Sequence, residues 1–146
     1  MTTMKKIFAL SILLLSVLAA RADERPIGFN ELPAAAQEFI KTHFAGVKMS
    51  YATKDAELTS TDYEVRLENG AKIEFNGNGE WTEVKNKGSQ VPQSIVPKGI
   101  AEYVSQNFPG VSVVKLERNR FRYDVSLSNH MELEFDLNSK FLRYDD

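Results

Sequence analysis

The stretch "YEVRLENGAKIEFNGNGEWTEV", residues 63–84, holds two Asn-Gly pairs nine positions apart, set between alternating apolar and polar residues. Such alternation predicts strands with one buried face, and Asn-Gly between strands favours a tight turn. A phosphate-binding glycine loop would instead be followed by a helix that begins with Lys and Ser or Thr. Here another strand follows, so we interpret both pairs as hairpin turns.

The register of the first hairpin depends on which side chains it buries. A two-residue turn at Asn69-Gly70 would point the apolar rows of its two strands to opposite faces of the sheet. A three-residue loop that starts at Glu68 pairs Val65 with Ile73 and gives one apolar face. Burying each large apolar side chain is worth ~1.5–3 kcal/mol, which exceeds a turn preference of ~1 kcal/mol. We therefore expect the three-residue loop, with Gly70 at positive φ.

At the second pair, residues 78–79, a two-residue turn fits the burial pattern. It sets Phe75 opposite Thr82 and Ile73 opposite Val84. The sequence therefore predicts the usual two-residue Asn-Gly hairpin at this position.

The chain also resembles itself. "ELPAAAQEFIKTHFAGV" (31–47) aligns with "IVPKGIAEYVSQNFPGV" (95–111), and "YEVRLENGAKIEFNGNGEW" (63–81) aligns with "YDVSLSNHMELEFDLNSKF" (123–141). Internal similarity of this kind is typical of repeat architectures. The polar stretch "KNKGSQVPQS" (85–94) lies between the copies, and we interpret it as their connector.

Each copy is expected to open with a helix. Pro33 and Pro97 stand where proline suits the first helical turn, and apolar residues then recur at helical spacing. Gly46 and Gly110 stand where a helix ends in the left-handed conformation. Four alternating stretches follow in each copy and predict antiparallel strands. In the second copy His130 takes a turn position that glycine holds in the first, and histidine tolerates positive φ.

These patterns predict an α+β fold of two tandem repeats, each one helix followed by about four antiparallel strands, with the helices packed on one face of the sheet. The first repeat covers residues 23–84, the linker residues 85–94 and the second repeat residues 95–146. A chain of this size buries roughly two-thirds of its surface, so it can fold without disulfides.

The N-terminus has the pattern of a secretory signal peptide, residues 1–22. Two lysines precede the apolar run "IFALSILLLSVL" (7–18), and "AARA" places Ala20 and Ala22 at the small positions of a cleavage site. The run is shorter than the ~20 residues that a membrane span needs. We expect cleavage after Ala22, a periplasmic or secreted mature chain, and no stable membrane insertion after cleavage.

Composition argues against several classes of function. Residues 1–22 hold three basic and no acidic residues, which leaves 15 basic against 20 acidic residues in the mature chain. A net negative charge argues against binding nucleic acid and anionic membrane surfaces. The chain has no cysteine, and His43 and His130 lack the spacing of metal ligands. The hairpin tips 76–80 and 136–140 carry too few carboxylates for a calcium loop. We therefore expect no enzyme, no metal and no cofactor.

The candidate site is a pair of large aromatic residues. With the two-residue turn, Trp81 and Phe141 point to the sheet face opposite the helices, among charged residues that include Arg66 and Arg143. A large aromatic residue amid charges on an open sheet face is typical of a binding surface. The alternative is that the other repeat or a loop covers both rings. We take Trp81, Phe141, Arg66 and Arg143 as the candidate partner-binding residues.

The motifs "LP..A.EFI..HF.G", "YEVRLENGAKIEFNGNGEW" and "YDVSL...MELEFD" resemble the PepSY-like group described as β-lactamase-inhibitor-like. The resemblance covers nearly all of the mature chain, although Ser139 and Phe141 depart from the glycine and tryptophan of the family pattern. It implies a secreted or periplasmic bacterial protein with a helix packed on an antiparallel sheet. The inhibitor that this family resembles binds its target enzyme on the concave sheet surface, and PepSY domains proper are associated with restraining proteases.

Together these observations predict a non-catalytic binding module for an unidentified protein or peptide partner in the cell envelope, using the helix-free sheet face. One alternative is an inhibitor or regulator of an envelope hydrolase of the protease or β-lactamase type. Another is a small-molecule or ion binder. The fold alone does not decide between them.

Overall fold

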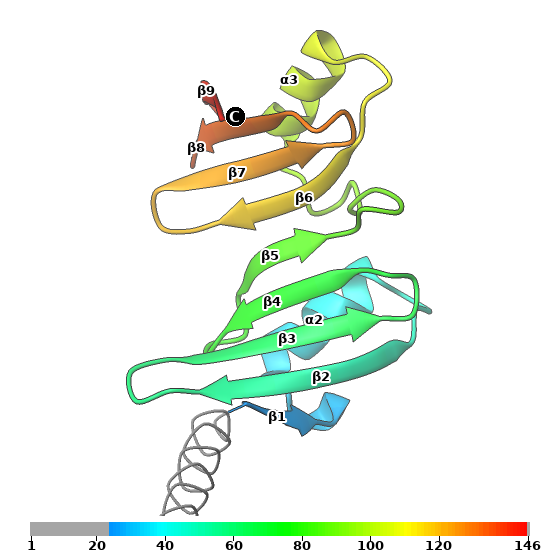
Figure 1. The fold of residues 1–146 in the computed structure, drawn as a ribbon, viewed down its shortest axis with the longest axis vertical. Helices are drawn as coiled ribbons and strands as arrows, with labels where there is room; N and C mark the ends of the chain where they lie inside the picture. The colour runs from blue at the N-terminus through cyan, green and yellow to red at the C-terminus, as the bar shows by residue number, and fades with distance from the viewer. Residues whose placement is uncertain (1–23, 146) are drawn as a thin grey trace, which may run out of the picture.

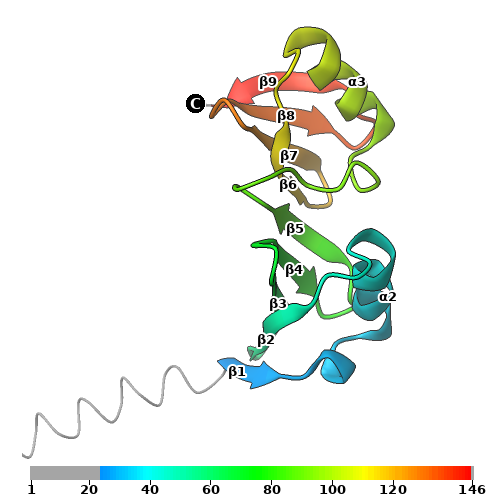
Figure 2. The same ribbon diagram turned by 90° about the vertical axis from the view of Figure 1, so that its right-hand side faces the viewer.

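The computed structural model describes residues 24–145, and the predicted signal peptide lies outside them. These residues form one antiparallel sheet of nine strands in sequence order, with two α-helices on one of its faces (Figure 1, Figure 2). The strands are β1 (Glu24–Ile27), β2 (Met49–Ala56), β3 (Thr61–Leu67), β4 (Lys72–Asn76), β5 (Trp81–Lys85), β6 (Val113–Arg118), β7 (Arg122–Leu127), β8 (Glu132–Asp136) and β9 (Phe141–Asp145). The helices are the 3-10 helix η1 (Phe29–Glu31), α2 (Ala34–His43) and α3 (Lys98–Asn107). Within the described residues, none of them is long and apolar enough to span a bilayer.

The predicted fold class is wrong: the chain is not two tandem repeats that each consist of a helix and about four strands. Strand β5 pairs with β6 through Val84–Leu116 and its neighbours, so the strands form a single, predominantly antiparallel sheet. An additional strand, β1, pairs with β2, and only two ten-residue α-helices accompany the nine strands within residues 24–145. Comparing the chain with itself shows what its halves share, but not which strand edges meet. Pairing β5 with β6 covers two edges that would otherwise be open to aggregation.

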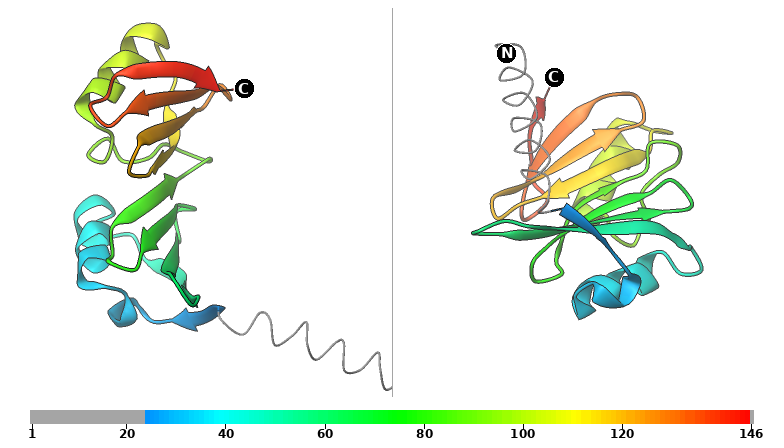
Figure 3. Two further views of the ribbon diagram at one scale, coloured as in Figure 1. Left: turned by 90° about the vertical axis from the view of Figure 1, so that its left-hand side faces the viewer. Right: turned by 60° about the horizontal axis from the view of Figure 1, so that its bottom comes forward.

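The core lies between the sheet and the helices, which are both on the same side of the sheet (Figure 3). Helix α2 buries Ala36 and Ile40, and α3 buries Ile100 and Val104. The strands bury every second side chain on this side, as alternation requires. The largest fully buried side chains are those of Phe75, Phe135, Ile73, Ile100, Leu116, Leu127 and Leu133.

The predicted helix boundaries are confirmed. Pro33 and Pro97 stand at the start of α2 and α3. Gly46 and Gly110, both with φ of 78°, follow the C-terminal ends of these helices. Glycine reaches this left-handed conformation without the steric cost that a side chain would add.

The predicted register of the first hairpin is also confirmed. Val65 pairs with Ile73 across β3 and β4. Gly70 has φ of 90°, and His130 has φ of 70° at the β7–β8 turn. Burial of the apolar row therefore sets the register here, as expected from its larger free energy.

The second hairpin differs from its predicted register. The Asn76 N–H donates to the Glu80 carbonyl (2.9 Å) and the Gly79 N–H donates to the Asn76 carbonyl (3.0 Å), so the turn has three residues rather than two. Phe75 consequently pairs with Trp81, and a bulge one residue further along β5 restores the predicted register for the rest of the pair. The bulge keeps Trp81 on the apolar side, because burial of the ring outweighs the preference for a two-residue turn.

Candidate binding face

The predicted exposure of Trp81 is wrong. The residue is only 8% exposed and belongs to the hydrophobic core. Its ring centroid lies 6.2 Å from that of Phe39 on α2. The Arg118 guanidinium carbon lies 3.9 Å from the Trp81 ring centroid, and Arg118 Nε donates a hydrogen bond to the Trp81 carbonyl (2.8 Å). Trp81 is therefore a core residue, placed there by the three-residue turn before β5, and cannot be an exposed anchor.

Phe141 lies under the other helix, so its predicted orientation is wrong for the same reason. The Asp136 N–H donates to the Lys140 carbonyl (2.9 Å), which gives the β8–β9 hairpin a three-residue turn. Phe141 then pairs with Phe135. Its ring stacks on that of Tyr103 from α3, with centroids 4.7 Å apart and an interplanar angle of 11°. Neither of the two predicted aromatic anchors is on the helix-free face.

The helix-free face instead carries two rows of like charges that run across the strands, and we call it the charged face. The acidic row has one carboxylate on each strand from β3 to β8, namely Glu64, Glu74, Glu83, Glu117, Asp124 and Glu134. The basic row has one cation on each strand from β3 to β6, namely Arg66, Lys72, Lys85 and Lys115. Like charges directly opposite one another destabilise a sheet, so this face depends on ion pairs between the rows.

Two lysines of the basic row provide these ion pairs at the centre of the sheet. Lys72 Nζ lies 3.0 Å from a Glu74 carboxylate oxygen and 2.8 Å from one of Glu83. Lys115 Nζ lies 2.6 Å from Glu117 and 3.5 Å from Glu83. Burial by itself raises the pKa of Glu83, but the hydrogen bond from Lys72 and the charges of both lysines hold that pKa below its ordinary value. Glu83 is therefore a carboxylate shared by two ammonium groups.

Arg66 and Arg143 lie on the charged face, as predicted, but near its opposite ends, on β3 and β9. The Arg66 side chain is 41% exposed, and its Nε lies 2.9 Å from a Glu64 carboxylate oxygen. The Arg143 side chain is 65% exposed and donates two hydrogen bonds to Glu134, at 2.6 and 3.2 Å. These bonds lower the pKa of Glu134. The structure does not bring the two arginines together, and their role in binding stays a prediction.

Lys85 is the exception in the basic row. Among the described residues it forms no ion pair, because Glu83, two positions along the same strand, is held by Lys72 and Lys115. Its pKa is lowered, first by burial and then by the positive charge of Lys87 and Lys72. Lys87, on the loop after β5, also forms no ion pair within residues 24–145. In this part of the chain, the centre of the charged face thus holds two ammonium groups without a carboxylate partner.

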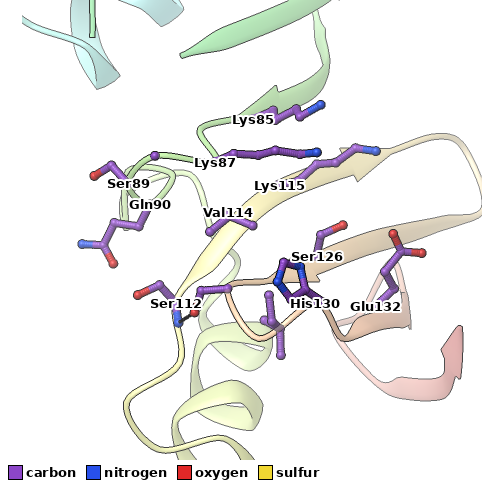
Figure 4. A pocket seen from close by; sticks show the side chains of 13 residues that line it. Lys85, Lys87, Ser89, Gln90, Ser112, Val114, Lys115, Ser126, His130 and Glu132 are labelled. Atoms are coloured by element: carbon purple, nitrogen blue, oxygen red, sulfur yellow. Dashed lines mark hydrogen bonds between the residues drawn. The ribbon is translucent and has the colours of Figure 1, made fainter. Parts of the chain in front are cut away.

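These two lysines open onto a groove of about 700 Å³ between the loop of residues 86–90 and strands β6 to β8. Hydrogen bonds fix both ends of the loop to β6, since the Asn86 N–H donates to the Val114 carbonyl (2.8 Å) and the Val91 N–H donates to the Val113 carbonyl (2.9 Å). Figure 4 shows the side chains of Lys85, Lys87 and Lys115 extending in the same direction, with the Ser126 hydroxyl nearby. The other lining residues are Gly88, Ser89, Gln90, Ser112, Val114, Leu127, Ser128, His130 and Glu132. We call this the lysine groove.

The sequence interpretation missed the lysine groove. It treated residues 85–94 as a connector, and the lysines at its start carried no motif. One signal was present, because the predicted pairing of Ile73 with Val84 also sets Lys72 opposite Lys85.

Within the described residues, no group of three or more His, Cys, Asp or Glu side chains is placed to hold a metal ion. At the β4–β5 tip, the Asn76 Oδ1 accepts hydrogen bonds from the Asn78 and Glu80 N–H groups, both at 3.0 Å. Its side-chain oxygen is therefore engaged within the turn itself, as is usual for Asn at such positions.

A family model described as "Putative beta-lactamase-inhibitor-like, PepSY-like" matches residues 61–143. The chain belongs to the PepSY-like family. This match confirms the family resemblance stated from the sequence motifs. The comparison with curated proteins found no match.

Three solved structures that are similar to this chain come from Bacteroides species. A "putative calcium-regulated periplasmic protein" of Bacteroides thetaiotaomicron is 40% identical, with a TM-score of 0.82, and the match covers 86% of this PepSY-like chain and 98% of that one. A putative periplasmic protein of Bacteroides vulgatus, from a family designated DUF2874, is 40% identical with a TM-score of 0.81, covering 86% and 99% of the two chains. A second putative periplasmic protein of Bacteroides vulgatus, of unknown function, is 38% identical with a TM-score of 0.80, and the match covers 84% of this chain and 99% of that one.

Proposed function

We propose that this chain is a non-catalytic binding module of the cell envelope, which binds a protein or peptide partner through its charged face. The PepSY-like family is non-catalytic in general. The three similar solved proteins are described as putative periplasmic proteins, which supports a periplasmic location for this chain.

The proposal rests on the observation that the charged face is left open to solvent. Both helices cover the opposite side of the sheet, and no described segment lies over the rows of charges except the loop of residues 86–90 (Figure 2). The other three cations of the basic row, Arg66, Lys72 and Lys115, are each paired with a carboxylate. Among residues 24–145, Lys85 and Lys87 are left without such partners in a groove, which favours an external ligand.

A pull-down from the native envelope fraction tests the proposal. The baits are the mature chain, the double variant R66Q/R143Q on the charged face, and the charge-matched double variant K41Q/K98Q on the helix side. Lys41 and Lys98 each have one loose ion pair, at 3.9 Å, and are largely exposed. We expect a defined partner with the wild type and K41Q/K98Q, and weaker capture with R66Q/R143Q.

Loss of Arg143 leaves the buried Glu134 with a weaker partner and can destabilise the double variant. The single variant R66Q, which keeps Arg143, is therefore the control for folding. A thermal melt of each bait shows whether it is folded. Equal capture by the sheet-face and helix-side variants, or capture of no defined partner by the wild type, would contradict the proposal.

A second candidate is inhibition of an envelope hydrolase, which is supported by the family's β-lactamase-inhibitor-like description. It makes the partner an enzyme of the protease or β-lactamase type. Adding the purified mature chain to such enzymes and measuring their rates tests it. Inhibition is supported if an enzyme's rate falls in proportion to the amount of wild-type chain added but does not fall when R66Q/R143Q is added instead. Unchanged rates for all of the enzymes tested count against it.

A further inference from the structure

We propose that the lysine groove binds a short acidic peptide segment of the partner, with Lys85 and Lys87 pairing with its carboxylates. This rests on the proposed function and names the chemistry of the partner. The charge of the groove, its hydrogen-bond donors and its acidic neighbours each favour such a ligand.

The local charge of the groove is opposite to that of the whole chain. The chain has 18 basic and 20 acidic residues, yet Lys85, Lys87 and Lys115 gather at one side of this groove. Lys85 pairs directly with Lys115 across the strands, and such like-charge neighbours repel each other. Of the three, only Lys115 has carboxylates among the described residues to compensate it. An incoming carboxylate would therefore remove an unfavourable interaction as well as form a favourable one.

The groove also has donors without a charge. Ser126 lies on β7 directly opposite Lys115, and its hydroxyl reaches toward the lysine side chains in Figure 4. Ser89 lines the groove from the loop side. Ser126 is held by its strand, and hydrogen bonds fix both ends of the loop that carries Ser89 to β6. Both donors are therefore in place before a ligand arrives, which reduces the entropy lost on binding.

The surroundings limit the ligand to a short anionic segment. The acidic row runs beside the lysines, two residues along each strand, which places its backbone about 7 Å from theirs, and its carboxylates reach Lys115. Glu132 closes the far side of the groove and forms no ion pair within the described residues. A long polyanion, such as nucleic acid or an anionic membrane, would lie over these carboxylates and be repelled. A peptide with a few acidic residues can meet the lysines alone.

The test is a binding titration with a fluorescently labelled peptide of four glutamates flanked by Gly and Ser, and its counterpart in which glutamine replaces each glutamate. The proteins are the mature chain, K85Q/K87Q and the charge-matched K41Q/K98Q. We expect the glutamate peptide to bind the wild type and K41Q/K98Q and the glutamine peptide not to bind. Loss of two exposed ion pairs should weaken binding to K85Q/K87Q by about fivefold to tenfold.

Salt and inorganic phosphate distinguish a peptide groove from a site for small anions. Binding should weaken as salt rises, because the pairs are exposed to solvent. Equal binding of the two peptides, or equal loss in both double variants, would overturn the inference. So would millimolar inorganic phosphate that displaces the peptide completely, since the groove would then be a small-anion site. In any of these cases, partner capture that still depends on Arg66 and Arg143 would leave the proposed function standing.

Discussion

Replacing Trp81 by alanine tests the packing that places the charged face on the outside. Trp81 is 8% exposed and contacts Phe39, Phe75 and Arg118. Truncating a buried tryptophan costs ~3–5 kcal/mol from lost transfer free energy and the cavity left behind. The cation–π contact with Arg118 adds ~0.5–1 kcal/mol. We expect W81A to lose about 4 kcal/mol of unfolding free energy, which for a chain of this size lowers the Tm by roughly 10–20 °C.

The assay is thermal and urea unfolding of the mature chain, the W81A variant and the control variant L58A. Leu58 is fully exposed, so L58A should change the stability by less than about 0.5 kcal/mol. The chain has a single tryptophan, so its fluorescence reports on this ring alone. In the folded protein the emission should be shifted to short wavelength and protected from acrylamide. The packing would be refuted if W81A had the Tm of the wild type and acrylamide readily quenched the Trp81 fluorescence of the folded wild type. Trp81 would then lie on the surface.

Four further predictions concern turns, charge and calcium. H130G should stabilise the chain by about 1 kcal/mol or less in urea melts, because glycine adopts the positive φ of this turn more easily than histidine. G79A should destabilise it by more than about 1 kcal/mol, because this glycine has φ of 81° and an added Cβ would lie 2.8 Å from the Pro33 Cβ. The hydrogen bond from Arg143 lowers the pKa of Glu134 below its ordinary 4.5. The ion pair therefore stabilises the fold fully above about pH 4.5, and this contribution is lost as the pH falls through the lowered pKa. In melts, E134Q should lose less stability than the wild type between neutral pH and about pH 3. Millimolar calcium should leave the Tm of the mature chain unchanged, because the hairpin tips 76–80 and 136–140 carry too few carboxylates for a calcium loop, and a concentration-dependent rise in Tm would show a site.

Local patterns predicted much of the structure. The register of the first hairpin followed from the sequence because its two possible registers differ in the burial of a whole apolar row, so the free energies are far apart. The helix boundaries at Pro33 and Gly46 could be predicted because proline and glycine each have one strong conformational reason to stand there. Positive φ at His130 followed from its alignment with Gly70.

The second hairpin could not be predicted because a bulge follows its turn. Both the two-residue turn and the three-residue turn with a bulge pair Ile73 with Val84, so the apolar row of β4 does not distinguish them. They differ only in the side to which Trp81 points. That side is decided by contact with Phe39 from α2, which is distant in sequence, and the error moved both aromatic residues to the wrong face.

The candidate site depended on a contact between distant strands. The predicted register of β4 and β5 set Lys72 beside Lys85, but the pairing of Lys85 with Lys115 exists only because β5 meets β6. Nothing in the self-comparison of the chain indicated that pairing. The loop of residues 86–90 likewise forms a groove only because its ends bind to β6.

The proposed function requires the partner to meet the charged face and not the helix side. Site-specific photocrosslinking in the native envelope measures this, with a photoreactive residue at Ser126 in the lysine groove or at Glu102 on the exposed side of α3. We expect one defined crosslinked species from position 126 and none from position 102. Crosslinks of equal strength from both positions, or from position 102 alone, would contradict the proposed binding face.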